Sequence, residues 1–148
     1  MRKAGILFIL CGIVIIFTEF NYYKLITPQY VIRDLEKNGW KYEIDKNMSN
    51  PFGYTDIKNK IIKAKNYRIL LHELGHYIDI KCGNVSQTDE FLKIYNLEKE
   101  KSEFDEYYKS TPREYFAETY ENMLENNLRS GESVGYVKQV IKGCFVQN

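Results

Sequence analysis

The sequence predicts an α+β domain in which a small N-terminal β-sheet is followed by helices. Two short strand candidates, residues 41–45 and 60–64, come early in the chain and hold alternating or β-branched residues. Longer segments with helical periodicity and helix-capping residues follow them. A few strands followed by several helices is the order typical of an α+β architecture.

The remaining elements of the domain are predicted from their start and stop signals. A helix is predicted from Thr27-Pro28 to Gly39, because Thr and Pro favour helix starts and Gly favours helix ends. Residues 47–55 are rich in Asn, Ser, Pro and Gly and are predicted to form a loop. The later helices are expected at 68–81, 89–101, 111–128 and 133–142.

Residues 1–23 precede the predicted domain, which covers residues 24–148. Arg2 and Lys3 open the chain, and an apolar run follows them. This is the pattern of a signal peptide or a signal anchor. The small residues that signal peptidase requires do not follow the run. An uncleaved anchor through residues 4–20 is therefore favoured over a cleaved signal that would release a secreted domain. Basic residues stay in the cytoplasm, so the domain is expected on the extracellular face of the membrane.

Charge and cysteine content narrow the possible functions. The 148 residues carry a net charge of +1, and the charges are well mixed, without the basic tract of a nucleic-acid binder. Of the three cysteines, Cys11 lies in the apolar run. Cys82 and Cys144 could pair in an oxidising exterior, and two free thiols are equally compatible with the sequence.

The central motif is His72-Glu73-Leu74-Gly75-His76, which has the form H-E-x-x-H. On a helix, residues i and i+4 lie on one face, so both imidazoles can bind one zinc ion. Glu73 lies beside them and can act as general base toward water. The chain has only two histidines, and both are in this motif.

A catalytic zinc takes three protein ligands, so the third must be a cysteine or a carboxylate. Cys82 follows His76 at the spacing of a metzincin ligand, but Asp79 stands where that pattern needs glycine. Glu114 and Glu118, at i and i+4 of the 111–128 helix, share one face. One of them can bind zinc while the other hydrogen-bonds a histidine. Alternatively, Glu114 completes a capping box with Thr111, and Glu118 is a surface acid.

The two motifs together resemble those of the lethal-factor-like and Pro-Pro endopeptidase family of zinc metallopeptidases. The likeness covers residues 69–124 and rests on His72 to His76 followed by Glu114-Tyr115-Phe116-Ala117-Glu118. It implies a zincin-like fold of the gluzincin type, with Zn²⁺ bound by His72, His76 and Glu114. It also implies that Glu118 supports the site and that Tyr107, seven residues before Glu114, is catalytic.

The predicted function is that of a zinc metalloendopeptidase acting on extracellular protein or peptide substrates, with proline-rich peptides as candidates from the resemblance. Glu73 would move the proton of the attacking water, and Tyr107 would stabilise the oxyanion. Substrate is expected to extend along the 60–64 strand. Asp79 either supports the metal site or only ends its helix. The alternative functions are a catalytically silent, membrane-anchored zinc-binding module and a regulatory H-E-x-x-H peptidase.

Overall fold

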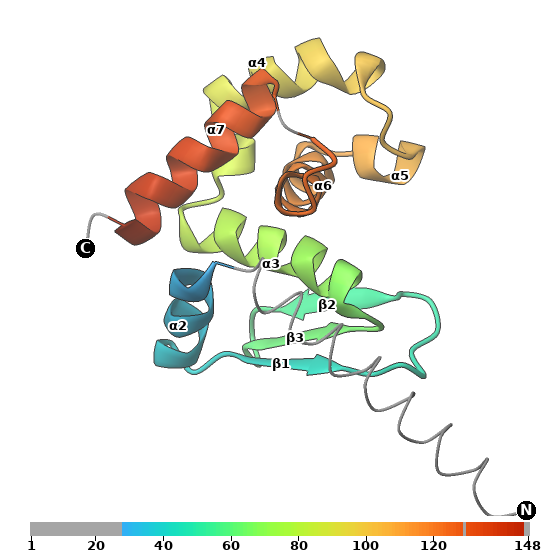
Figure 1. The fold of residues 1–148 in the computed structure, drawn as a ribbon, viewed down its shortest axis with the longest axis vertical. Helices are drawn as coiled ribbons and strands as arrows, with labels where there is room; N and C mark the ends of the chain where they lie inside the picture. Colours follow the sequence, from blue (N-terminus) through green and yellow to red (C-terminus); the bar gives the residue numbers. More distant parts are fainter. Residues whose placement is uncertain (1–27, 129, 147–148) are drawn as a thin grey trace, which may run out of the picture.

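The structure is a computed structural model that describes residues 28–128 and 130–146. A three-stranded sheet forms one layer, helix α3 (Tyr67–Lys81) lies across it, and further helices pack on the other side of α3 (Figure 1). The α+β prediction is confirmed. The predicted anchor, residues 1–23, lies outside the described residues. The remaining helices are α2 (Gln29–Lys37), α4 (Asp89–Glu98), α5 (Glu106–Lys109), α6 (Pro112–Leu124) and α7 (Glu132–Ile141).

The sheet has the strand order β1-β3-β2, formed by β1 (Lys41–Ile44), β3 (Ile61–Ala64) and β2 (Gly53–Asp56). β3 pairs with β1 in parallel and with β2 in antiparallel orientation. β3 therefore has no free edge, and the prediction that substrate adds to the 60–64 strand is wrong. In the part of the chain that the structure describes, the free edges belong to β1 and β2.

β2 lies where the sequence predicted a loop. Its four residues include a glycine and an aspartate, and Pro51 stands just before it, so neither composition nor alternation indicated a strand. The strand exists because it pairs with β3, with Thr55 opposite Ile62 and Gly53 opposite Ala64. Sequence reasoning missed it because the pairing partner supplies the stabilisation.

Capping residues fix the ends of the two helices that carry the motifs. The Asn66 side chain accepts a hydrogen bond from the amide of Ile69, which starts α3 one residue before the predicted boundary. Thr111 accepts one from the amide of Glu114, with Pro112 in the first helical turn of α6. Pro28, expected as the first helical residue of α2, is its N-cap residue. The helix predicted at 89–101 ends at Glu98 and continues as a 3₁₀ turn, Lys99–Lys101.

The contact between α3 and α6 depends on two small residues. A Cβ atom on Gly75 would lie 2.7 Å from Ala117 Cα, closer than Cβ atoms approach other atoms, and a tight 3.1 Å from Ala117 Cβ. Small residues on both helices therefore allow α3 and α6 to approach each other closely. Around this contact the core buries Leu74, Phe116 and Tyr120 completely. The tight packing places the motif of α3 directly against the motif of α6.

A disulfide joins Cys82, at the end of α3, to Cys144 in the C-terminal π-helical turn Lys142–Val146. The two Cα atoms are 5.9 Å apart, and the bond closes a loop with a sequence separation of 62. Cys82 is therefore not available as a zinc ligand, so that alternative is wrong.

Replacement of Cys144 by serine should lower the free energy of unfolding by about 4 kcal/mol, because the unfolded chain regains the entropy of an open loop of this length. Urea denaturation of the full chain measures the change. A reducing agent should lower the denaturation midpoint of the wild type by the same amount. Cys11→Ser should have the midpoint of the wild type. Equal stability of Cys144→Ser and wild type would contradict the disulfide.

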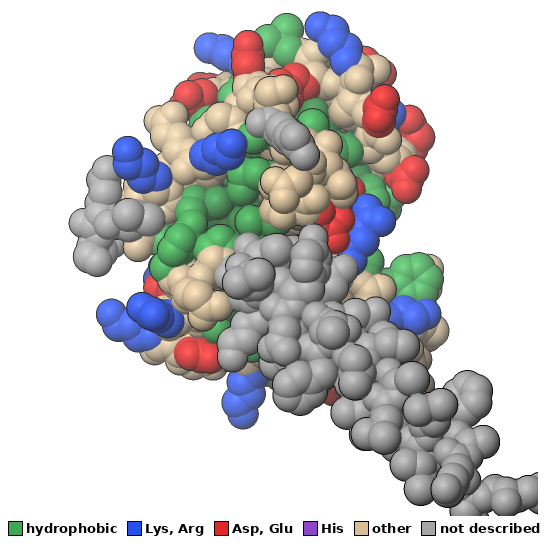
Figure 2. Space-filling view, in the orientation of Figure 1, with side chains coloured by type: hydrophobic (Ala, Val, Ile, Leu, Met, Phe, Trp, Pro, Cys, Tyr) green, Lys and Arg blue, Asp and Glu red, His purple; other side chains and the backbone are tan. Residues whose placement is uncertain are grey.

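Charges of both signs are spread over the face of the molecule seen in Figure 2, in keeping with the mixed sequence. Among the described helices, none combines the length and the apolar character needed to cross a membrane.

Candidate metal centre

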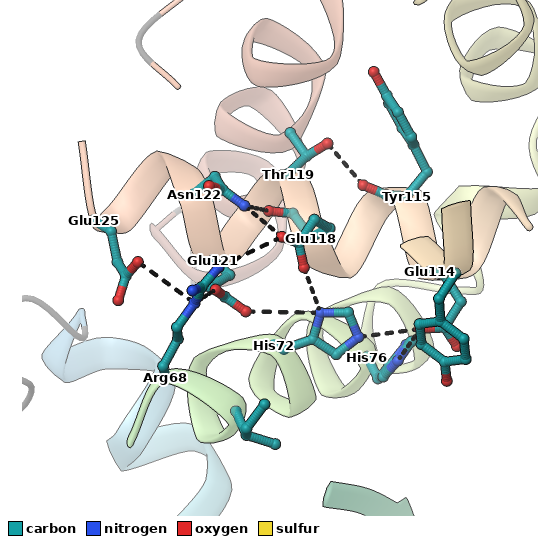
Figure 3. Close-up of polar contacts among 12 residues, drawn as sticks. Arg68, His72, His76, Glu114, Tyr115, Glu118, Thr119, Glu121, Asn122 and Glu125 are labelled. Atoms are coloured by element: carbon teal, nitrogen blue, oxygen red, sulfur yellow. Dashed lines mark hydrogen bonds and ion pairs between the residues drawn. The ribbon is translucent and has the colours of Figure 1, made fainter. Parts of the chain in front are cut away.

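The two histidines of α3 lie side by side on the face that meets α6 (Figure 3). Their ring centroids are 4.9 Å apart, as expected for residues one helical turn apart. The His72 side chain is 6% exposed and that of His76 is 12% exposed. Both rings therefore lie at the base of a partly covered site.

Glu114, in the first turn of α6, reaches both imidazoles. Its Oε2 lies 3.1 Å from Nε2 of His72 and 3.5 Å from Nε2 of His76. One donor atom from each of the three residues fits within 4.8 Å of the others. Zinc–donor distances near 2.1 Å in a tetrahedral set separate neighbouring donors by about 3.4 Å. The donor types and the two measured spacings therefore fit a zinc ion.

Glu114 takes part in the helix cap through its backbone amide and in the candidate metal site through its side chain. Thr111 Oγ1 accepts a hydrogen bond from the backbone amide of Glu114, while the Glu114 side chain turns toward the histidines. The capping-box alternative is therefore wrong for the carboxylate, and half of the box is present. Thr111 holds the helix end from which Glu114 projects.

Glu118 holds the other nitrogen of His72. Its Oε2 lies 3.2 Å from Nδ1 of His72, and its Oε1 accepts a hydrogen bond of 2.8 Å from Asn122 Nδ2. Glu118 is only 3% exposed, so the surface-acid alternative is wrong. A carboxylate on Nδ1 orients the ring so that Nε2 faces Glu114.

Two residues that sequence reasoning missed, Arg68 and Glu121, lie beside Glu118. Arg68, one turn before His72, donates from Nε to Glu121 Oε1 at 2.6 Å, and its Nη2 lies 4.0 Å from Glu118 (Figure 3). Burial raises the pKa of Glu121 to about 7, against the opposing effect of Arg68. The guanidinium supplies the positive charge for this carboxylate cluster. The sequence did contain a signal for Glu121, because Glu114, Glu118 and Glu121 stand at i, i+4 and i+7 and so share one face of the helix.

Glu73 lies against strand β2 of the sheet. It is 6% exposed, and its Oε2 accepts a hydrogen bond of 2.8 Å from Thr55 Oγ1 on β2. Burial raises the pKa of the Glu73 carboxyl, although the Thr55 hydrogen bond opposes that effect. A carboxylate with a raised pKa is a stronger base at neutral pH, as general-base catalysis requires.

Tyr107 and Tyr108 lie on α5, which the sequence did not predict. Tyr107 is 65% exposed. Partial desolvation and the charges of Glu114 and Glu73 raise the pKa of its phenol, which keeps the hydroxyl protonated. Tyr108 instead packs on the His72 ring with centroids 5.1 Å apart. Glu114 and Glu73 thus act on the pKa of Tyr107, whereas Tyr108 covers the ring of His72.

Asp79 does not touch the candidate centre. Its carboxylate is fully buried and accepts hydrogen bonds from the amide and hydroxyl of Ser86 at 2.7 and 2.8 Å. Arg113 Nε lies 3.5 Å from the same carboxylate. Among the described residues Asp79 forms no hydrogen bond or ion pair with either histidine. It fixes the turn after α3 and the start of α6 instead.

The acids around His72 favour its charged form. Burial alone would lower the pKa of His72, but hydrogen bonds to Glu114 and Glu118 and the charge of Glu73 outweigh burial and raise it to about 9. Burial likewise opposes ionisation of Glu114, yet the two histidines lower its pKa to about 2. In the metal-free chain a proton on His72 therefore supplies positive charge that a metal ion would replace.

Zinc binding at pH 7.5 should consequently release about one proton from His72, because a ligand imidazole must be neutral. Calorimetric titration of the full chain in two buffers of different ionisation enthalpy measures the release. The apparent affinity should fall about tenfold per pH unit as the pH drops below about 9. A heat of binding that is the same in both buffers would show that His72 is already neutral.

Comparison with known proteins identifies a family whose model covers all residues of the candidate centre. A family model described as "Anthrax toxin lethal factor, N- and C-terminal domain" matches residues 19–130, which include both motifs and Tyr107. A comparison with curated proteins and another with solved structures each found no match. The matched region covers more than half of the sequence, so the chain belongs to the anthrax toxin lethal factor family.

Proposed function

We propose that the protein is a zinc-dependent metalloendopeptidase with a zincin-like catalytic domain. The observation that supports this most strongly is the meeting of His72, His76 and Glu114 through three nitrogen and oxygen donors within 4.8 Å. A purely structural zinc site is normally closed by four protein ligands. Here three residues supply the donors, and the side chain of the third, Glu114, is 18% exposed. The site is therefore partly open to solvent on the side of Glu114.

The chain's own groups have distinct roles in this proposal. When bound, zinc would supply Lewis-acid chemistry that acidifies water and polarises the scissile carbonyl. Glu73 takes the proton of the attacking water and passes it to the leaving amine. Tyr107 donates a hydrogen bond to the developing oxyanion, an effect of roughly 3–4 kcal/mol. Glu118 keeps the His72 ring in place.

An extended substrate would pair with the edge of β2. Lys65 N donates to Phe52 O, so Phe52 and Lys65 form a hydrogen-bonded pair. Such pairs alternate along an antiparallel ladder, which makes Tyr54 and Lys63 the next one. The backbone groups of Gly53 and Thr55 therefore point away from β3. A peptide strand could use these groups for main-chain recognition.

The domain is further proposed to act outside the cell. The apolar start of the sequence and the Cys82–Cys144 disulfide support this, since disulfides persist in oxidising compartments. A phosphatase that is active only outside the cytoplasm, fused after residue 148, should be active. Activity of only a cytoplasmic reporter would favour the regulatory peptidase instead.

The proposed activity is tested by incubating the zinc-loaded full chain with a peptide library that contains proline-rich and proline-free sequences. We expect cleavage that a chelator stops and added zinc restores. The cleaved sequences would define specificity, for which proline-rich peptides are the family's suggestion. Zinc binding without cleavage of any peptide or of unfolded protein would favour the silent binding module.

A further inference from the structure

The Thr55 hydroxyl of strand β2 lies near two oxygens of Glu73, one in the carboxylate and one in the backbone. Thr55 Oγ1 lies 2.8 Å from Glu73 Oε2 and 3.2 Å from the Glu73 backbone carbonyl oxygen. A hydroxyl has one proton, and an ionised carboxylate attracts it more strongly than a neutral carbonyl. Thr55 therefore donates to Oε2 when Glu73 is charged.

Gly53, two residues earlier on the same face of β2, leaves room for the other oxygen. A Cβ atom there would lie 2.8 Å from Glu73 Oε1 and would overlap Ile69 Cγ2. The carboxylate thus lies over a bare stretch of backbone at Gly53 and is held by a hydroxyl at Thr55. Both residues face α3 because they pair with the buried Ala64 and Ile62.

This arrangement distinguishes the two oxygens of Glu73. Oε2 is engaged by Thr55, and no described residue hydrogen-bonds Oε1. A general base must keep its carboxylate within hydrogen-bond reach of the water from which it takes a proton. A buried carboxylate that is fixed at one oxygen presents the other in a constant direction.

We propose that Thr55 is a positioning residue that holds Glu73 for proton transfer through Oε1. The inference rests on the proposed function and deepens it. Because the backbone groups of Gly53 and Thr55 also form the free edge of the sheet, one short strand would set the relative positions of the substrate chain and the general base. Thr55 does not itself contact the reacting atoms.

Replacement of Thr55 by valine removes the hydroxyl and keeps the branched shape. We expect kcat to fall about tenfold, as for the loss of a hydrogen bond to a charged group, with KM changed less than about twofold. The probe is a quenched fluorescent peptide with the best-cleaved library sequence. Thr55→Ser should recover most of kcat, and zinc content should equal that of wild type in both variants. Thr119→Val is the matched control, since Thr119 is buried and, among the described residues, its hydroxyl donates to the Tyr115 carbonyl oxygen at 2.7 Å and to no group of the candidate centre.

Wild-type kcat in Thr55→Val, alongside an inactive Glu73→Gln, would overturn the positioning role and leave the proposed function intact. A rise in KM with unchanged kcat would also overturn it, because Thr55 would then act on substrate binding. A double-mutant cycle of Thr55→Val and Glu73→Ala, measured by urea unfolding of the zinc-free chain, tests the contact without catalysis, because each single change removes the hydrogen bond. Additive effects would contradict the hydrogen bond. Coupling in a protein that cleaves nothing would refute the proposed function and reduce the contact to a structural one.

Discussion

Glu73→Gln should abolish peptide cleavage while zinc remains bound. Glutamine keeps the shape of glutamate and can still accept a hydrogen bond from Thr55 Oγ1, but it cannot take a proton from water. Positioned proton transfer typically contributes 10²- to 10⁴-fold, so kcat/KM should fall by about that factor. The measurement is peptide cleavage together with zinc content of the same sample.

Glu90→Gln is the control for this prediction, because Glu90 is exposed at the start of α4, on a helix that carries none of the candidate ligands. It should cleave as wild type does. Undiminished cleavage by Glu73→Gln would remove Glu73 from the mechanism. Loss of zinc from that variant would instead mean that Glu73 contributes to holding the metal.

Replacement of Glu114 by alanine should lower zinc affinity more than any other change outside the two histidines. The substitution removes the donor that lies 3.1 and 3.5 Å from the two Nε2 atoms. Loss of a residue that only supports a ligand typically costs 10- to 100-fold in affinity, and loss of the ligand itself should exceed about 100-fold. Competition with a fluorescent zinc chelator measures the change.

Two further variants, one in α6 and one at its C-cap, show how specific this effect is. Glu118→Gln should lower zinc affinity by about 10- to 100-fold, since Glu118 contacts Nδ1 of His72 and not the nitrogen that faces the metal site. Glu125→Gln should bind zinc as wild type does, because the Glu125 carboxylate lies 3.9 Å from Arg68 at the outer end of the cluster. Equal affinity of Glu114→Ala and wild type would assign the third ligand to another residue.

The residues of the candidate centre could be predicted because each lies on a helix whose spacing is fixed. His72 and His76 share a face by virtue of i,i+4 geometry, and the same rule pairs Glu114 with Glu118. The sequence also contains residues that allow the two motif helices to come into contact. Gly75 and Ala117, the small residues within the two motifs, permit the contact that the structure shows.

The residues that sequence reasoning missed depend on contacts between distant segments. Thr55 gave no signal, because β2 is stabilised by pairing with β3 and its composition resembles a loop. Arg68 reaches Glu121 across 53 residues of sequence, a distance over which no periodicity operates. The substrate strand was misassigned for the same reason, since strand order is a property of the sheet and not of any one strand.

The roles predicted for Asp79 and Cys82 illustrate the limits of spacing within one helix. Both stand near the end of α3, close in sequence to His76. The helix continues through Asp79 to Lys81, and Cys82 ends it in a disulfide with Cys144. A metzincin-like turn back to the metal would require the helix to stop earlier. Proximity in sequence therefore gave no information on which groups face the centre.

The most direct test of the proposed centre is zinc X-ray absorption of the full chain loaded with one equivalent of zinc. We expect a first shell of nitrogen and oxygen near 2.0–2.1 Å, outer-shell scattering from two imidazoles, and no sulfur at about 2.3 Å. The imidazoles are those of His72 and His76, and Glu114 supplies an oxygen. A sulfur ligand, scattering from fewer than two imidazoles, or failure to retain the metal would contradict the central claim.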